Sequence, residues 1–154
     1  MLWRTLYNHF SSRDELIAAA LDLLLQEARD SLYLNTPAEV DPAERLRQFV
    51  RLVYDIYDRQ GDSLTTLLDH RGDPQIGPQV AMMRESRRER LDEILKDPQA
   101  ALLLPLPHAV AIAFALTSHE TWEALVRESG LPQLAALELV TTTLDTVVFG
   151  REPG

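Results

Sequence analysis

Residues 107–149 read PHAVAIAFALTSHETWEALVRESGLPQLAALELVTTTLDTVVF, and this stretch is the most apolar part of the chain. The segment Ser129-Gly130-Leu131-Pro132 places a glycine that ends a helix before a proline that starts one. The apolar residues on both sides run for helical rather than strand lengths. The stretch therefore predicts two antiparallel helices, at about residues 107–129 and 132–149.

The predicted hairpin carries few charges toward its end. Between residues 129 and 150 only Glu138 and Asp145 are charged. A terminal helix that apolar usually buries more than one side, so we expect a second copy of the chain to cover it. The plainer alternative is an ordinary core helix of a monomer.

The rest of the chain also indicates helices joined by short connectors. Start signals lie at Ser12-Arg13-Asp14-Glu15 and at Asp41-Pro42-Ala43-Glu44. No run of residues alternates apolar and polar side chains as a strand does. We expect helices at about residues 2–10, 12–34, 42–61, 63–70 and 78–96, and an irregular proline-rich segment at 98–107. The fold class predicted is an all-α antiparallel helical bundle.

Composition limits the classes of protein that the chain can represent. Its 154 residues carry 15 Lys+Arg and 24 Asp+Glu, a formal net charge of −9, with 45% hydrophobic residues. These values suit one globular domain, and the acidity argues against nucleic-acid binding over the whole surface. The absence of cysteine excludes disulfides and thiolate metal sites, and no segment is apolar enough to span a membrane. With no secretory signal at the start, we expect a cytoplasmic protein without a membrane partner.

Residues 5–16, TLYNHFSSRDEL, are locally different. Residues 1–13 contain two arginines and no acid. Backbone phosphates accept hydrogen bonds from such side chains and from helix N-terminal amides. From this chemistry alone, a surface turn with scattered polar residues is the better interpretation. The candidates for phosphate or DNA contact are Thr5, Tyr7, Asn8, His9 and Arg13.

The same string closely resembles the end of the recognition helix, and the helix that follows it, in tetracycline-repressor-like (TetR-type) transcriptional regulators. The residues that match are Thr5, Leu6, Tyr7, His9, Phe10, Ser12, Arg13, Glu15 and Leu16. Residues 118–125, SHETWEAL, are similar to part of the effector domain of that family. The resemblance is tight over about residues 4–21 and loose over the remainder.

The resemblance implies two parts and a mechanism. Residues 1–34 would be a remnant of the helix-turn-helix domain with its connecting helix, and 35–154 the domain for ligand binding and dimerisation. Tyr7, His9 and Arg13 match positions that usually contact DNA phosphates. The implied function is a regulator, a repressor in the usual case, that binds operator DNA as a homodimer and is released by a small molecule. That molecule would act through the 12–34 helix on the separation of the two reading heads.

One departure from the family pattern affects the DNA-binding end. In the family, two helices and the start of the recognition helix precede this motif, whereas here Met1 lies almost at the motif itself. The helix that crosses the DNA backbone is therefore missing from this sequence. We expect these residues alone to bind DNA weakly or not at all.

The predicted effector domain offers six candidate ligand-binding residues. In the 78–96 helix, Arg87 falls within an apolar stripe and Arg84 lies at its edge. A buried guanidinium needs an anion; pairing with a nearby acid or reaching to solvent is the favoured interpretation, and a ligand carboxylate or phosphate the alternative. The periodicity places His119 and Trp122 on one helix face with His108, Ile112, Ala115 and Val126, as a pocket wall or as core. Tyr57 and Phe114 complete the candidates, although core packing is the more usual role of each.

Enzyme signatures are missing. His119-Glu120-Thr121-Trp122-Glu123 lacks the second histidine of the zinc-protease helix, and the nucleotide-binding glycine loops and the Gly-x-Ser-x-Gly elbow do not occur. The sequence thus predicts no enzyme, metal or cofactor. The alternative to the regulator is a helical dimer that does not bind DNA and acts as a small-molecule-binding or scaffold module.

Overall fold

The structure is a computed structural model that describes residues 15, 19, 23 and 40–152. All regular elements in these residues are helical, which confirms the predicted all-α bundle for this part of the chain. The two expected N-terminal helices, the boundary at residue 34 and the five candidate DNA-contact residues lie outside the described residues. The elements are α3 (Pro42–Asp69), α4 (Gly77–Leu95), α5 (Leu106–Leu116), α6 (His119–Trp122), the π-helical η1 (Glu123–Glu128) and α7 (Gln133–Phe149).

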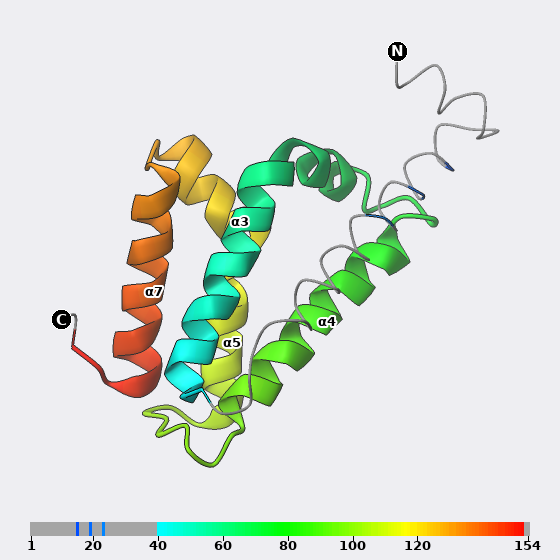
Figure 1. Cartoon of the computed structure of the whole chain (residues 1–154). Helices are drawn as coiled ribbons and strands as arrows, with labels where there is room; N and C mark the ends of the chain where they lie inside the picture. The colour runs from blue at the N-terminus through cyan, green and yellow to red at the C-terminus, as the bar shows by residue number, and fades with distance from the viewer. Residues whose placement is uncertain (1–14, 16–18, 20–22, 24–39, 153–154) are drawn as a thin grey trace.

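Helix α3 is the centre of the bundle. Helix α7 lies along it, α4 crosses it at an incline on the other side, and α5 packs mainly against α4 (Figure 1). The apolar residues of α3 recur at helical spacing and form one buried stripe, and most of the apolar stripe predicted on α4 is also buried. No helix in the described part of the chain is both long and apolar enough to cross a membrane. The buried members of the two stripes are Leu46, Phe49, Val50, Val53 and Tyr57 on α3, and Val80, Leu91, Ile94 and Leu95 on α4.

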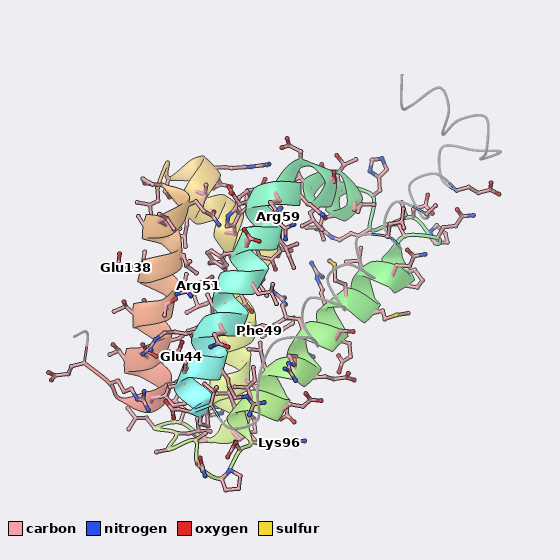
Figure 2. All side chains as sticks on the ribbon, viewed as in Figure 1. Glu44, Phe49, Arg51, Arg59, Lys96 and Glu138 are labelled. Atoms are coloured by element: carbon pink, nitrogen blue, oxygen red, sulfur yellow. The ribbon has the colours of Figure 1, made fainter. Side chains whose placement is uncertain are left out.

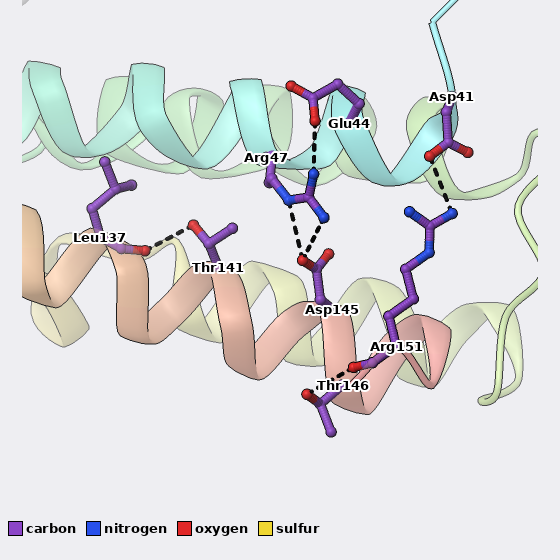
Figure 3. A network of polar contacts seen from close by, with 8 residues as sticks. All are labelled: Asp41, Glu44, Arg47, Leu137, Thr141, Asp145, Thr146 and Arg151. Carbon is purple, nitrogen blue, oxygen red and sulfur yellow. Dashed lines mark hydrogen bonds and ion pairs between the residues drawn. The ribbon is translucent and has the colours of Figure 1, made fainter. Parts of the chain in front are cut away.

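The first turn of α3 is tied to the end of α7. Pro42 starts α3 as predicted, but the Asp41 side chain makes no capping hydrogen bond and instead accepts one from Arg151 at 3.1 Å. Arg47 donates to Asp145 through Nη2 at 2.7 Å and through Nε at 3.1 Å (Figure 3). These pairs fix α3 and α7 in antiparallel order.

The break expected near Gly61 is present as a kink at Gln60, where the backbone is not helical (φ −126°, ψ 16°), and helical turns resume beyond it to Asp69. The separate 63–70 helix is therefore the second half of α3, which bends toward the start of α4 (Figure 1). The His70 ring caps this end because its Nδ1 lies 2.7 Å from the Thr66 carbonyl, as expected for a histidine at a helix C-terminus.

Gly61 allows the kinked helix to contact α6. A Cβ atom at Gly61 would lie 2.8 Å from Cη2 of Trp122 and 2.9 Å from Nη2 of Arg127. The Trp122 ring is held on its other side by a hydrogen bond to Gln133, so it cannot move away freely. Close packing at residue 61 therefore requires glycine.

We expect Gly61→Ala to lower the free energy of unfolding by about 1–2 kcal/mol. Overpacking costs roughly 1–3 kcal/mol, and the better helix propensity of alanine offsets about 0.5–1 kcal/mol of that. Gly72→Ala is the matched control, since nothing lies within 4 Å of its added Cβ atom. Urea unfolding of both variants measures the difference, and equal stability of the two would contradict the steric argument.

The predicted 107–129 helix is wrong in one respect, because it breaks after Leu116. Ser118 is extended (φ −74°, ψ 152°) and accepts a hydrogen bond from the Thr121 amide at 3.1 Å, so a new helix begins there. The break also overturns the expected shared face: His108 and Ala115 are exposed, whereas His119 and Trp122 are buried. The predicted 132–149 helix is confirmed as α7, and residues 98–105 are irregular as expected.

Candidate functional site

A small cavity lies where α3, on both sides of its kink, meets α4 and α6. Its volume is about 70 Å³, room for a few water molecules. Most of its wall is apolar; the charged groups come from α4 and α6, and α3 adds the polar groups of Tyr57 and Gln60. The lining residues are Val53, Ile56, Tyr57, Gln60, Leu64, Leu68, Met83, Arg84, Arg87, His119 and Glu120.

Tyr57 is a buried, neutral donor in the wall. Its hydroxyl donates to the Thr117 carbonyl at 2.6 Å, and burial raises the pKa of Tyr57 to about 12. The same oxygen is 3.4 Å from Nη1 of Arg87, which donates to it. The hydroxyl therefore joins the α5–α6 break to Arg87 on α4.

His119 packs against both Tyr57 and Trp122 in a cluster of three rings. Its ring meets Tyr57 edge-on at 85° with centroids 5.4 Å apart, and lies 5.6 Å from the Trp122 ring. The Thr65 hydroxyl donates to the Gly61 carbonyl, so its oxygen is left to accept from Nε2 of His119 at 3.4 Å. Among the described residues, no donor or acceptor reaches the buried Nδ1 atom.

Burial lowers the pKa of His119. The nearby carboxylates of Glu123 and Glu120 act in the opposite direction, and Arg127 adds to the lowering. The imidazole is therefore neutral at pH 7 in the folded protein.

This neutral histidine predicts a loss of stability in mild acid. The unfolded chain binds a proton on residue 119 below about pH 6.5, whereas the folded chain does so only at lower pH. The free energy of unfolding should thus fall as the pH drops through 6.5 toward the lowered pKa of His119. Urea unfolding at about pH 7.5 and about pH 5.5, above the range of the carboxylates, should show a smaller fall for His119→Gln than for the wild type. Equal falls in the two proteins would show that His119 is not the group concerned.

The two arginines of the wall have different partners. Nη2 of Arg84 lies 2.8 Å from Oε1 of Glu120, and this ion pair joins α4 to α6. The Arg87 guanidinium stacks over the Phe114 ring at 4.1 Å, and no carboxylate in the described part of the chain is within ion-pair distance of it. The pairing expected of a buried guanidinium is found at Arg84 rather than at Arg87.

Glu120 is held in its charged form. Burial acts to raise the pKa of Glu120, but its own backbone amide and the guanidinium groups of Arg84 and Arg87 lower it further than burial raises it. The carboxylate is therefore ionised at neutral pH. Any other anion that binds Arg84 or Arg87 has to compete with it.

The six candidate ligand residues fall into three groups. Tyr57, Arg84, Arg87 and His119 line the cavity. Trp122 lies behind this wall, packed on the rings of Tyr57 and His119. Phe114 lines a surface hollow outside it.

Several lining residues were not predicted from the sequence. The apolar wall comes from α3 side chains that were not among the candidate ligand residues, and Gln60 lines the cavity at the kink of α3. Glu120 was also missed, although a carboxylate beside a candidate pocket histidine could have drawn attention. Its pairing with Arg84 joins residues 36 apart in sequence, a contact that no local pattern reveals.

Comparison of the chain with protein-family models, curated proteins and solved structures found no match.

Proposed function

We propose that the protein is a ligand-responsive transcriptional regulator of the TetR type. In this proposal a small molecule occupies the cavity, the chain acts in the cytoplasm as a homodimer, and ligand binding releases operator DNA. The resemblance of residues 5–16 to a DNA-reading segment suggests the DNA partner. The observation that carries the proposal is the apolar cavity into which polar groups from three helices converge, since ligand sites have this composition.

The cavity is suited to a ligand only after a local rearrangement. Sites for small molecules usually enclose 300–1,000 Å³, roughly, which is more than the volume found here. Three of the residues around it, Met83, Arg84 and Glu120, are partly or well exposed and have flexible side chains that can move outward. A ligand that favours the opened arrangement would shift the equilibrium between the two states, as an effector must.

The outer face of α7 supports the homodimer. Helix α7 carries two charged residues, Glu138 and Asp145. Asp145 is paired with Arg47, whereas Glu138 points away from the bundle (Figure 2). The outward side of α7 therefore carries the single charge of Glu138. Leu134 is 77% exposed and Leu139 is 49% exposed on the same helix. An outward helix face with large apolar residues and one charge fits self-association through residues 107–129 and 132–149.

Three measurements on the whole chain test the proposal in turn. Analytical ultracentrifugation gives the oligomeric state, and a thermal-shift screen of a small-molecule library identifies compounds that raise the melting temperature. Selection from a random DNA pool, with and without such a compound, then tests operator binding and its release. A monomer that no compound stabilises would overturn the proposal.

The cavity and the α7 face also fit a second function, a helical dimer that binds a small molecule but no DNA. Both features lie in the described residues, whereas the candidate DNA contacts do not. The DNA selection separates the two: a dimer that binds ligand and enriches no sequence favours the module.

A further inference from the structure

An open hollow on the protein surface adjoins the cavity. It lies between α4, the end of α5 and the start of α6, with a volume of about 460 Å³. Its wall includes Arg84, Arg87 and Glu120, which also line the inner cavity. These three side chains therefore separate the apolar interior from the surface.

The dividing wall has more positive than negative charge. Within it, the single carboxylate of Glu120 faces the guanidinium groups of Arg84 and Arg87 and is bonded to Arg84. Arg88, at the rim of the hollow, has its own partner in Glu85 at 3.8 Å. Arg87 is left with the Phe114 ring and a long hydrogen bond to Tyr57. A ring face offers less than a full negative charge, so Arg87 remains a half-buried cation that an anion would stabilise.

The groups behind the wall limit what can follow the anion. The α3 side contributes Val53, Ile56, Leu64 and Leu68, and α4 contributes Met83. The O–H group of Tyr57 already donates its hydrogen bond to the Thr117 carbonyl, so it is not available to donate to a ligand. A ligand that enters past Arg87 thus meets an anion site first and an apolar site next.

We propose that the site binds an apolar monocarboxylate, whose carboxylate pairs with Arg87 and takes the place of Glu120 on Arg84 while its hydrocarbon part enters the cavity. This inference rests on the proposed ligand-binding function and adds its chemical class. Guanidinium groups bind carboxylates through paired N–H donors, so one ligand carboxylate serves both arginines. The exchange breaks the ion pair between Arg84 and Glu120, which joins α4 to α6. Ligand binding would therefore loosen the contact between these two helices.

The test uses sodium hexanoate and hexanamide, which share an apolar chain and differ in charge. Isothermal titration of the whole chain at about pH 7.5, where the hexanoate carboxylate is ionised, should show binding of hexanoate, with hexanamide at least about 10-fold weaker. Melting temperature should rise with hexanoate for the same reason. Hexanamide binding as tightly as hexanoate, or no binding of hexanoate, overturns the proposal.

Two variants test the carboxylate exchange itself. Arg87→Gln should weaken hexanoate binding at least about 10-fold, whereas Glu120→Gln should strengthen it several-fold because the competing carboxylate is gone. Arg59→Gln, which removes the same charge from the exposed side of α3, is the matched control and should bind as the wild type does. If Arg87→Gln does not fold, Arg87→Lys is used in its place. The Arg87→Lys protein should bind hexanoate more weakly than the wild type does, and it should still bind hexanoate more tightly than hexanamide.

The exchange is overturned if Glu120→Gln weakens binding or if an Arg87 variant binds like the wild type. These outcomes differ from failure of the proposed function. Library compounds without a carboxylate that bind and release DNA would leave the regulator in place and remove only the ligand class.

Discussion

Replacing Trp122 by alanine is expected to lower the free energy of unfolding by about 3–5 kcal/mol, the usual range for removal of a buried aromatic side chain. Trp122 is 3% exposed and joins three helices. Its indole N–H donates to Oε1 of Gln133 on α7 at 2.7 Å, and Nε2 of Gln133 donates to the Tyr54 carbonyl on α3 at 2.8 Å. The variant leaves a cavity and also leaves the half-buried Gln133 amide without one of its partners.

Urea unfolding followed by circular dichroism measures this loss. Leu134→Ala on α7 is the control, because a leucine that is 77% exposed should change stability by no more than about 0.5 kcal/mol. Trp122→Phe keeps an aromatic ring but cannot bond to Gln133, so its loss should lie between those of the other two variants. A Trp122→Ala protein as stable as the Leu134→Ala protein would mean that α6 contributes little to the fold.

The second large effect concerns self-association. We expect Leu139→Arg to raise the dissociation constant of the proposed homodimer at least about 30-fold, the equivalent of about 2 kcal/mol. Leu139 lies on the outward face of α7, and two copies related by a two-fold axis would bring two arginines close together there. Sedimentation velocity over a range of concentrations measures the change.

Met82→Arg is the control for this effect. Met82 on α4 is also 49% exposed, so the substitution changes the same area and charge on a different face. It should leave the dissociation constant as it is in the wild type. A wild-type chain that sediments as a monomer at tens of micromolar, or a Met82→Arg chain as dissociated as Leu139→Arg, would contradict dimerisation through α7.

The parts of the fold that follow from periodicity could be predicted from the sequence. The stripe from Leu46 to Tyr57 and the stripe of α4 are buried because each repeats with the period of a helix against one core. The stop at Gly130 was also predicted; its φ of 73° is a backbone conformation that glycine adopts without strain. These features depend on residues close in sequence.

The parts that were missed depend on competition between local and distant contacts. Leu116 to Trp122 reads as one helix, but the Ser118 hydroxyl captures the Thr121 amide while Tyr54 and Tyr57 bind the carbonyls of Leu116 and Thr117, so the break is stabilised from α3. A prediction from the local sequence cannot take these two tyrosines into account, because they lie 60 or more residues away along the chain. The cavity was only partly predictable for the same reason, since Glu120 enters it through an ion pair with another helix.

The ion pair between Arg47 and Asp145 joins residues 98 apart in sequence. During translation, α3 leaves the ribosome long before α7, the helix that carries Asp145. The apolar stripe of α3 therefore stays partly uncovered until α7 has been synthesised. Closing so long a loop is slow compared with forming a single helix, and the uncovered apolar surface of α3 can aggregate in the meantime. Nascent chains stalled before α7 should therefore be the ones that chaperones hold.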